Sequence, residues 1–261
     1  MNSLIFLIND AVKSASSYSL LSGTTATGFD INNSTFGNRG KTHRTTKSSS
    51  EVIRAYVYSS DLDIDYCIIS RADLMLTQNT TRVRLKQRNS GGSWSYISGV
   101  DYNPLDDIDL IGINSQDLII PCSPSDLRGV ALSTIPVSGS EASEIGKFYA
   151  CISKQIAGVI SLNLQYESLE KYTTVNTIDY LRKYEIEGVF SLSFSDLTKA
   201  EITSVDDFIK DLYLPFFIYD PNTHLWEHQL EHVVLISHEE IFNEKDNYSI
   251  VLNLGRIRQD V

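Results

Sequence analysis

One short stretch in the first half of the chain constrains its fold more than any other. In residues 82–88, charged or polar side chains alternate with Val83 and Leu85. A period of two places alternate side chains on opposite faces of a β-strand. Residues 89–92 are turn-forming, and residues 93–97 supply the next strand-like run. The stretch therefore predicts an antiparallel hairpin with one apolar and one polar face.

Similar short segments recur through the first 152 residues, with no helical period among them. The chain also contains 14 Tyr and 10 Phe, and aromatic and β-branched side chains favour strands. This pattern predicts a mainly β protein built on an antiparallel β-sandwich or barrel. The other candidate strands are residues 52–58, 64–69, 118–121, 129–135 and 147–152.

The last third of the chain has a different pattern and predicts a smaller α+β extension. Thr198 and Glu201 have the spacing of a capping box, with Leu197 placed to pack on Ile202. An apolar stripe at the 3.6-residue period then predicts one amphipathic helix that ends before Pro215. We expect strands at residues 190–194, 216–219, 232–236 and 248–254. The predicted domains are residues 1–160, an N-terminal arm plus sandwich, and residues 161–261, the acidic extension.

Residues 13–50 are rich in Ser, Thr, Gly and Asn and have little apolar periodicity. They predict a long loop or an extended arm, which is uncommon inside a domain unless it serves a purpose. Its basic residues are candidates for contact with a neighbouring molecule: Arg39, Lys41, Arg44 and Lys47.

The charge of the chain is unevenly spread. Residues 160–261 carry 8 basic and 18 acidic residues, a net charge of −10, against −1 for residues 1–159. Such a balance gives no general electrostatic reason to bind nucleic acid. It suits a solvated acidic surface or docking on a basic partner.

The three cysteines, Cys67, Cys122 and Cys151, lie in or beside apolar runs and have no paired spacing. Buried free thiols are therefore expected. The apolar run at residues 4–8 is too short for a signal peptide or a membrane span.

The polar face of the predicted hairpin carries four cations, Arg82, Arg84, Lys86 and Arg88. They suit an interaction with an acidic neighbour, a phosphate or an acidic glycan. They also suit the solvent face of an amphipathic strand, or an edge protected against unwanted pairing. Trp94, which follows the turn, is a candidate for stacking on sugar or for packing beside the hairpin.

Residues 228–232, His-Gln-Leu-Glu-His, match a zinc-peptidase motif. That chemistry needs both histidines on one helical face, whereas His232 opens a strand-like run. In a strand the two positions are roughly 13 Å apart, too far to share one metal ion. Asp61, Asp63 and Asp65 imitate the start of a calcium loop, but the later ligand positions do not fit. We therefore expect no catalytic residue, no metal centre and no cofactor.

Two runs carry a resemblance to a known family. The run IDYCIISRADLMLTQNTTRVRLKQRNSGGSWSYI and the later SEIGKFYACI resemble hairpins of galactose-binding-like, or discoidin-type, β-sandwich domains. With the extension FSLSFSDLTKAEITSVDDFIKDLYLPFFIYD, the chain is similar to tail-tip and baseplate proteins of tailed bacteriophages.

This resemblance implies an antiparallel β-sandwich of jelly-roll type and a non-enzymatic structural protein of a phage tail. It implies partners among other virion proteins and copies of itself in a ring-like homo-oligomer. The expected location is the virion tail, after synthesis in the host cytoplasm. The alternative function is a carbohydrate-binding module that recognises a glycan on the host surface.

Overall fold

The computed structural model describes most of the chain, and every structural statement concerns the described residues. They are residues 4–8, 10–12, 15–35, 41–47, 50–77, 80–103, 110–111, 116–123, 127–136, 142–156, 159–165, 186–210, 212, 214–222, 229–243 and 247–257.

The chain forms two compact units, which we describe separately. Asp10–Ile152 belong to the first, here called the sandwich unit. Met1–Asn9 and Ser153–Gln259 belong to the second, the C-terminal unit. The sequence-based division grouped residues 1–160, whereas in the structure the first strand belongs to the C-terminal unit. A four-residue apolar strand carries no local sign of its distant pairing partner.

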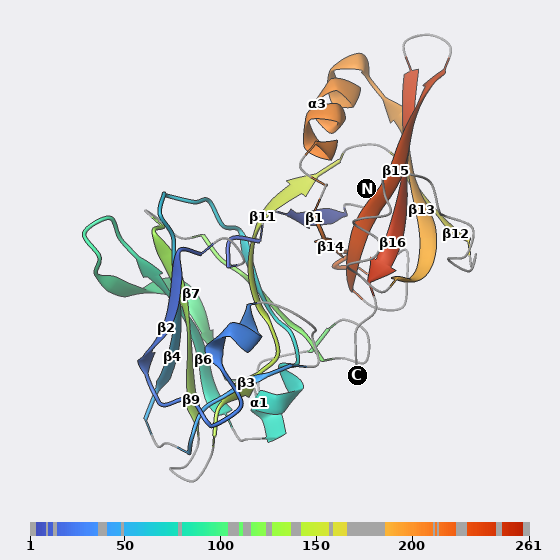
Figure 1. Ribbon diagram of the computed structural model, residues 1–261. Helices are drawn as coiled ribbons and strands as arrows, with labels where there is room; N and C mark the ends of the chain where they lie inside the picture. Colours follow the sequence, from blue (N-terminus) through green and yellow to red (C-terminus); the bar gives the residue numbers. More distant parts are fainter. Residues whose placement is uncertain are drawn as a thin grey trace. The chain divides into compact units, whose positions relative to one another are not determined.

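The larger sheet of the sandwich unit has five strands in the order β2-β4-β9-β6-β7 (Figure 1). Every pairing in it is antiparallel, as the alternating pattern predicts. The strands are β2 (Ser17–Ser22), β4 (Val52–Val57), β9 (Gly129–Pro136), β6 (Thr80–Arg88) and β7 (Trp94–Tyr102).

The second layer contains β5 (Tyr66–Ile69), which pairs with β8 (Leu118–Pro121) and β11 (Phe148–Gln155). Both layers contribute to one apolar core, in which Tyr56 stacks on Phe148 with ring centroids 5.1 Å apart. The short strands β3 (His43–Arg44) and β10 (Glu144–Ile145) pair with each other, and a short helix α1 (Asp73–Thr77) follows β5. The predicted antiparallel β-sandwich is therefore confirmed.

The prediction of an extended N-terminal arm is wrong for the described part of residues 13–50. β2 joins the five-stranded sheet, the 3-10 helix η1 (Ile31–Ser34) follows, and β3 pairs with β10. Of the four basic candidates, Arg44 forms an ion pair with Glu144 at 3.8 Å, and Lys41 and Lys47 are exposed. Arg39 lies outside the described residues. Polar composition misled the prediction, because these residues are held by hydrogen bonds rather than by an apolar face.

The main hydrogen-bond donor that anchors this segment is Arg54, a fully buried side chain on β4. Its Nε donates to His43 Nδ1 at 2.7 Å, and its terminal nitrogens donate to the Ser143 hydroxyl and carbonyl oxygens at 3.0 and 2.8 Å. Burial lowers the pKa of Arg54 to about 10, so the group stays charged at neutral pH. Burial and the charge of Arg54 lower the pKa of His43 to about 3, so this imidazole is neutral and free to accept.

The described part of the C-terminal unit is an antiparallel sheet in the order β12-β13-β16-β15-β14-β1, together with helix α3. Figure 1 shows β15 and β16 as a long hairpin. The strands are β1 (Ile5–Ile8), β12 (Val159–Gln165), β13 (Ile186–Leu197), β14 (Phe216–Tyr219), β15 (Leu230–Asn243) and β16 (Asn247–Ile257).

Helix α3 (Lys199–Ile209) begins with the capping box that the sequence predicts. Thr198 N donates to Glu201 Oε2 at 2.7 Å, and Glu201 N donates to Thr198 Oγ1 at 3.3 Å. The helix buries its apolar stripe, and the Phe208 ring meets Phe6 edge-on at 5.0 Å between centroids. The predicted α+β extension and its amphipathic helix are thus confirmed in the described part of the unit.

All three cysteines are free and buried, as expected. Burial raises the pKa of the Cys67 and Cys151 thiols well above the ordinary value. Within the described residues, no helix has the length and apolar character needed to cross a membrane.

Candidate functional site

The five-stranded sheet has one face on the sandwich core and one face turned away from it. Val83 and Leu85 of β6 lie in the core. By the alternation of the strand, Arg82, Arg84 and Lys86 lie on the opposite face. We call this second face the outer face.

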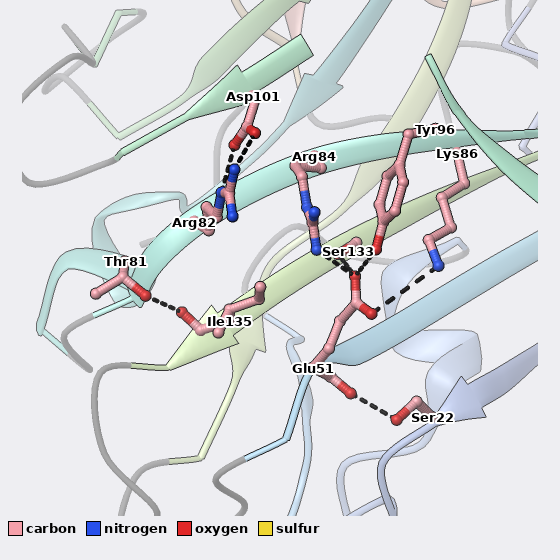
Figure 2. A network of polar contacts seen from close by, with 10 residues as sticks. All are labelled: Ser22, Glu51, Thr81, Arg82, Arg84, Lys86, Tyr96, Asp101, Ser133 and Ile135. Carbon is pink, nitrogen blue, oxygen red and sulfur yellow. Dashed lines mark hydrogen bonds and ion pairs between the residues drawn. The ribbon is translucent and has the colours of Figure 1, made fainter. Parts of the chain in front are cut away.

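A group of five side chains on the outer face forms one polar network, here called the Glu51 cluster: Glu51, Arg84, Lys86, Tyr96 and Ser133 (Figure 2). Glu51 Oε1 accepts hydrogen bonds from Arg84 at 3.0 Å, from the Tyr96 hydroxyl at 2.6 Å and from the Ser133 hydroxyl. Lys86 Nζ lies 3.9 Å from Glu51 Oε2. One carboxylate therefore organises side chains from three strands, β6, β7 and β9.

The strand register explains why these side chains meet. Lys86 on β6 lies opposite Tyr96 on β7, and Arg84 lies opposite Ser133 on β9. Glu51 directly precedes β4, and its carbonyl oxygen accepts a hydrogen bond from Ser22 of β2 at 2.5 Å. The cluster is thus a product of the order in which the strands pair.

The Tyr96 ring lies between the two cations, as Figure 2 shows. Arg84 Cζ is 4.0 Å from the ring centroid, and Lys86 Nζ is 4.3 Å from it. Both distances are typical of cation–π contacts. The ring therefore separates two like charges and holds both in place.

The electrostatics of Glu51 reflect its neighbours. Burial acts to raise the pKa of its carboxyl group, and the hydrogen bonds from Ser133 and Tyr96 act to lower it. The charges of Lys86 and Arg84 act in the same direction as these bonds, and the pKa lies below its ordinary value. Glu51 is consequently ionised at neutral pH.

Arg82 forms a separate pair at the rim of the outer face. Its guanidinium donates to both carboxylate oxygens of Asp101, at 2.8 and 2.5 Å. The Arg82 side chain is 51% exposed, so this pair is screened by water. The hydrogen bond from Arg82, followed in effect by its charge, holds the pKa of Asp101 below its ordinary value.

Trp94 packs on a small apolar cluster of the outer face, made by Ile53, Ala55 and Ala131. It lies opposite Arg88 in the strand register. A Cβ added at Gly129 would come within 3.0 Å of the Trp94 ring, so the glycine makes room for the indole. The structure therefore supports the packing interpretation of Trp94, and its role in sugar stacking stays a prediction.

Sequence reasoning found the cations of this face but missed their partners. Glu51, Tyr96, Ser133 and Asp101 lie far from them along the chain or on the next strand. The acidic partners, Glu51 and Asp101, both belong to the same sandwich unit as the cations. Glu51 lies two residues before Ile53 and four before Ala55, so strand alternation places its side chain on the same face as theirs. This spacing is the local sequence signal that places Glu51 on the outer face.

The zinc-peptidase motif is partly described. His228 lies outside the described residues, and Glu231 and His232 lie on strand β15, as the strand interpretation predicts. Glu231 is fully buried, and its carboxylate accepts from Arg256 Nε at 2.9 Å. The His232 ring stacks on Phe217 with centroids 4.3 Å apart. Glu231 is thus committed to a salt bridge and is not placed as a general base.

The calcium-like acidic turn also has a simpler role. Asp61 accepts a hydrogen bond from Arg128 Nε at 2.8 Å, in an exposed salt bridge. This bond links the turn before β5 to the residue that precedes β9.

No protein-family model matches the chain, and no curated protein matches it. Solved structures with a similar arrangement include a pectin-binding carbohydrate-binding module, with 13% identity and a TM-score of 0.39. The match covers 52% of this chain and 89% of that one.

Another is chitosan-binding module 2 of a chitosanase/glucanase from Paenibacillus sp. IK-5, in complex with chitotriose. It has 12% identity and a TM-score of 0.42, over 54% of this chain and 99% of that one. A GH29 fucosidase from Ruminococcus gnavus matches with 14% identity and a TM-score of 0.42, over 56% of this chain and 27% of the fucosidase. Similarity at this level does not assign a ligand to the present chain.

Proposed function

We propose that the sandwich unit binds an acidic polysaccharide on its outer face, at the Glu51 cluster. The observation that carries this proposal is the pair of cations, Arg84 and Lys86, held on both sides of the Tyr96 ring by one carboxylate. Two cations against one carboxylate leave the cluster with a formal charge of +1. An anionic ligand is therefore favoured over a neutral one.

The side chains of the cluster are arranged before any ligand arrives. Arg84 and Lys86 are only 16% and 15% exposed, and each is fixed by Glu51 and by the Tyr96 ring. A ligand that meets fixed side chains loses less of its binding free energy to ordering them. Lys86 Nζ, at 3.9 Å from Glu51, makes the longer ion pair and is the group that a sugar carboxylate can recruit.

The rest of the cluster suits sugar hydroxyl groups. Arg84 donates hydrogen bonds, the Glu51 carboxylate accepts them, and the Tyr96 hydroxyl can do both. Trp94 and the partly exposed Tyr96 add apolar surface on the same face. Sugars present hydroxyl groups and C–H faces together, so a surface of this mixed kind matches them.

The test is a titration of the full chain with polygalacturonate as the acidic polymer and dextran as the neutral one. We expect binding to polygalacturonate alone, and an affinity that falls as NaCl rises, because charge carries the interaction. Lys86→Gln should lower the affinity at least tenfold. The matched control is Arg82→Gln, which removes an equal charge from the same strand where Asp101 already neutralises it.

Equal binding to both polymers, or a loss shared by Lys86→Gln and Arg82→Gln, would contradict the proposal. Tyr96→Phe provides a finer test, since it removes only the hydrogen bond to Glu51 and keeps the ring between the cations. We expect a loss of affinity smaller than that of Lys86→Gln.

The proposed role is binding without catalysis. Glu51 holds a lowered pKa and is surrounded by cations, which suits a structural carboxylate and not a proton donor. Incubation with polygalacturonate should therefore release no new reducing ends. Their appearance, and their loss in Glu51→Gln, would show hydrolysis instead.

A second candidate function is assembly between copies of the chain, and one feature of the C-terminal unit favours it. Near the turn of the β15–β16 hairpin, the Phe242 side chain is 64% exposed and Ile241 is 39% exposed. Phe242 meets Tyr248 edge-on at 5.1 Å between centroids, so the exposed apolar surface is shared by both strands. Surface of this kind is common at protein contacts, and a two-fold axis would join the same patch on two copies.

Sedimentation of the wild-type chain and of Phe242→Ser tests this second candidate. We expect concentration-dependent association that the substitution abolishes, and a wild-type monomer at all concentrations would count against it. The ring-like assembly and the place in a phage tail stay predictions from the sequence resemblance.

A further inference from the structure

Three side chains of the C-terminal unit bring potential metal ligands together. Asp206 lies on α3, and His238 and Glu240 lie on β15. One ligand atom of each, two carboxylate oxygens and an imidazole nitrogen, all lie within 4.8 Å of one another. They belong to a different unit from the Glu51 cluster, so a role for them is independent of the proposed function.

Local structure explains this convergence. His238 and Glu240 are two residues apart on one strand, so their side chains leave the same face. The helix buries Val205 and Phe208 in the unit, and Asp206 lies half-buried at the side of this apolar stripe. The packing of α3 therefore brings its carboxylate to the strand.

The arrangement places two acids together. The pKa of the Glu240 carboxyl group is raised, first by its hydrogen bond with Asp206, then by partial burial and by the charge of Asp206. Two carboxylates this close repel each other when both are ionised, and a cation between them removes that repulsion. The nearby cation Lys210 forms an ion pair at 2.7 Å with Asp207, the residue that follows Asp206 in the helix.

We propose that Asp206, His238 and Glu240 form a binding site for a divalent transition metal ion, with Zn²⁺ as the best fit. Ligand atoms at about 2.1 Å from Zn²⁺ in a tetrahedron are about 3.4 Å apart, so small side-chain rotations close the site. An imidazole in the set favours Zn²⁺ over Mg²⁺ and Ca²⁺, which prefer oxygen ligands. The exposure of His238 and Glu240 leaves room for water as the fourth ligand.

The ion would join helix α3 to strand β15, which otherwise meet there through like charges. It would therefore stabilise this part of the unit by mass action in proportion to its occupancy. Nothing in the sequence indicates such a site, because positions 206, 238 and 240 form no metal motif and depend on the helix packing.

Calorimetric titration of EDTA-treated, tag-free full chain with ZnCl₂ tests the site. We expect one equivalent to bind at this site and the Tm to rise by about 4 °C at a tenfold excess over Kd. Asp206→Asn, His238→Gln and Glu240→Gln should each weaken binding at least tenfold. MgCl₂ and CaCl₂ at the same concentrations should produce neither effect.

Matched controls separate this site from other ligands of the chain. Asp207→Asn and Glu239→Gln remove neighbouring acids of the same helix and strand and should leave Zn²⁺ binding unchanged. The double variant His228→Gln/His232→Gln removes the histidines of the zinc-peptidase motif and should also leave this binding unchanged.

Absence of Zn²⁺ binding would overturn the proposal. So would binding that survives all three ligand substitutions, or that the double variant abolishes. The Tm of each metal-free variant verifies its fold, and a Co²⁺ absorption spectrum that is lost in His238→Gln gives a second readout of imidazole ligation.

Discussion

The Glu51 cluster of the sandwich unit and the Asp206–His238–Glu240 group of the C-terminal unit each place a glutamate among other polar side chains, with opposite results. In the first, one carboxylate receives two cations and two hydroxyl groups. In the second, two carboxylates and an imidazole face one another. The difference shows that the neighbours of a carboxylate decide whether its charge is neutralised or opposed. Strand register and helix packing decide which charges meet.

The contrast between the two groups extends to stability. Charges that are satisfied within the fold should contribute to stability, and their removal should be costly. Charges of one sign held together should reduce stability, and their removal should help. Three substitutions and a change of pH challenge this contrast, beginning with the largest expected effect.

Arg54→Ala should lower the free energy of unfolding by about 4 kcal/mol, because it leaves buried polar partners without their donor. Those partners include His43 and Ser143, and the substitution also opens a cavity in a fully buried position. Urea unfolding measures the loss. Arg82→Ala, at an exposed pair, should leave the midpoint close to that of the wild type. Similar losses at both positions would show that the buried, hydrogen-bonded Arg54 contributes no more to stability than the solvent-screened Arg82.

Acidification should destabilise the sandwich unit through His43. Its pKa is about 3 in the fold and about 6.5 in the unfolded chain. The unfolded state therefore binds the extra proton between these values, so this contribution to stability is complete above pH 6.5 and decreases as pH falls towards 3. Between pH 7 and pH 4 the loss should be about 3 kcal/mol.

Unfolding by urea at a series of pH values measures this effect. His43→Gln keeps a side-chain acceptor for Arg54 and has no titrating ring. The difference between the pH profiles of the wild type and of His43→Gln gives the contribution of the histidine. Identical slopes would show that His43 does not cause the pH dependence.

Glu51→Gln should lower the free energy of unfolding by about 1 kcal/mol, because Arg84 and Lys86 lose the charge that neutralises and fixes them. Urea unfolding at low salt is the measurement. High salt should reduce the difference, since screening weakens the repulsion between the two cations. A stabilising effect would show that the cluster does not contribute to the fold.

Asp206→Asn should have a small effect of the opposite sign. In EDTA at pH 7 we expect a Tm about 1 °C above the wild type, because the substitution removes the like charge beside Glu240. The raised pKa of Glu240 means that the repulsion exists above that pKa and disappears as the carboxyl group takes up its proton. The gain should therefore vanish at low pH, and a gain that persists there would have another cause.

Much of the secondary structure follows from local sequence. The strand of residues 82–88 was predicted from alternation, and the capping box of Thr198 and Glu201 was predicted from spacing. Each signal lies within a few residues of the element it describes. The arm was predicted wrongly, because β2 gains its place from pairing with β4 and not from its own composition.

The candidate sites were predicted only in part. The cations of strand β6 were identified, since a single strand shows its polar face. Glu51 and Tyr96 were not linked to them, because their contact depends on the register of β4, β9 and β6. Asp206 and Glu240 are separated by 34 residues, and nothing local connects them.

The sequence by itself determined a mainly β protein, its central hairpin and one capped helix, because these depend on periods of two and 3.6 residues along the chain. The tertiary structure alone decided that β1 pairs with β14, that Arg54 holds His43, and which charges are neutralised. The physical reason is distance along the chain. Hydrogen bonds and ion pairs between remote segments form only after the strands choose their neighbours, and that choice reflects the packing of the whole core.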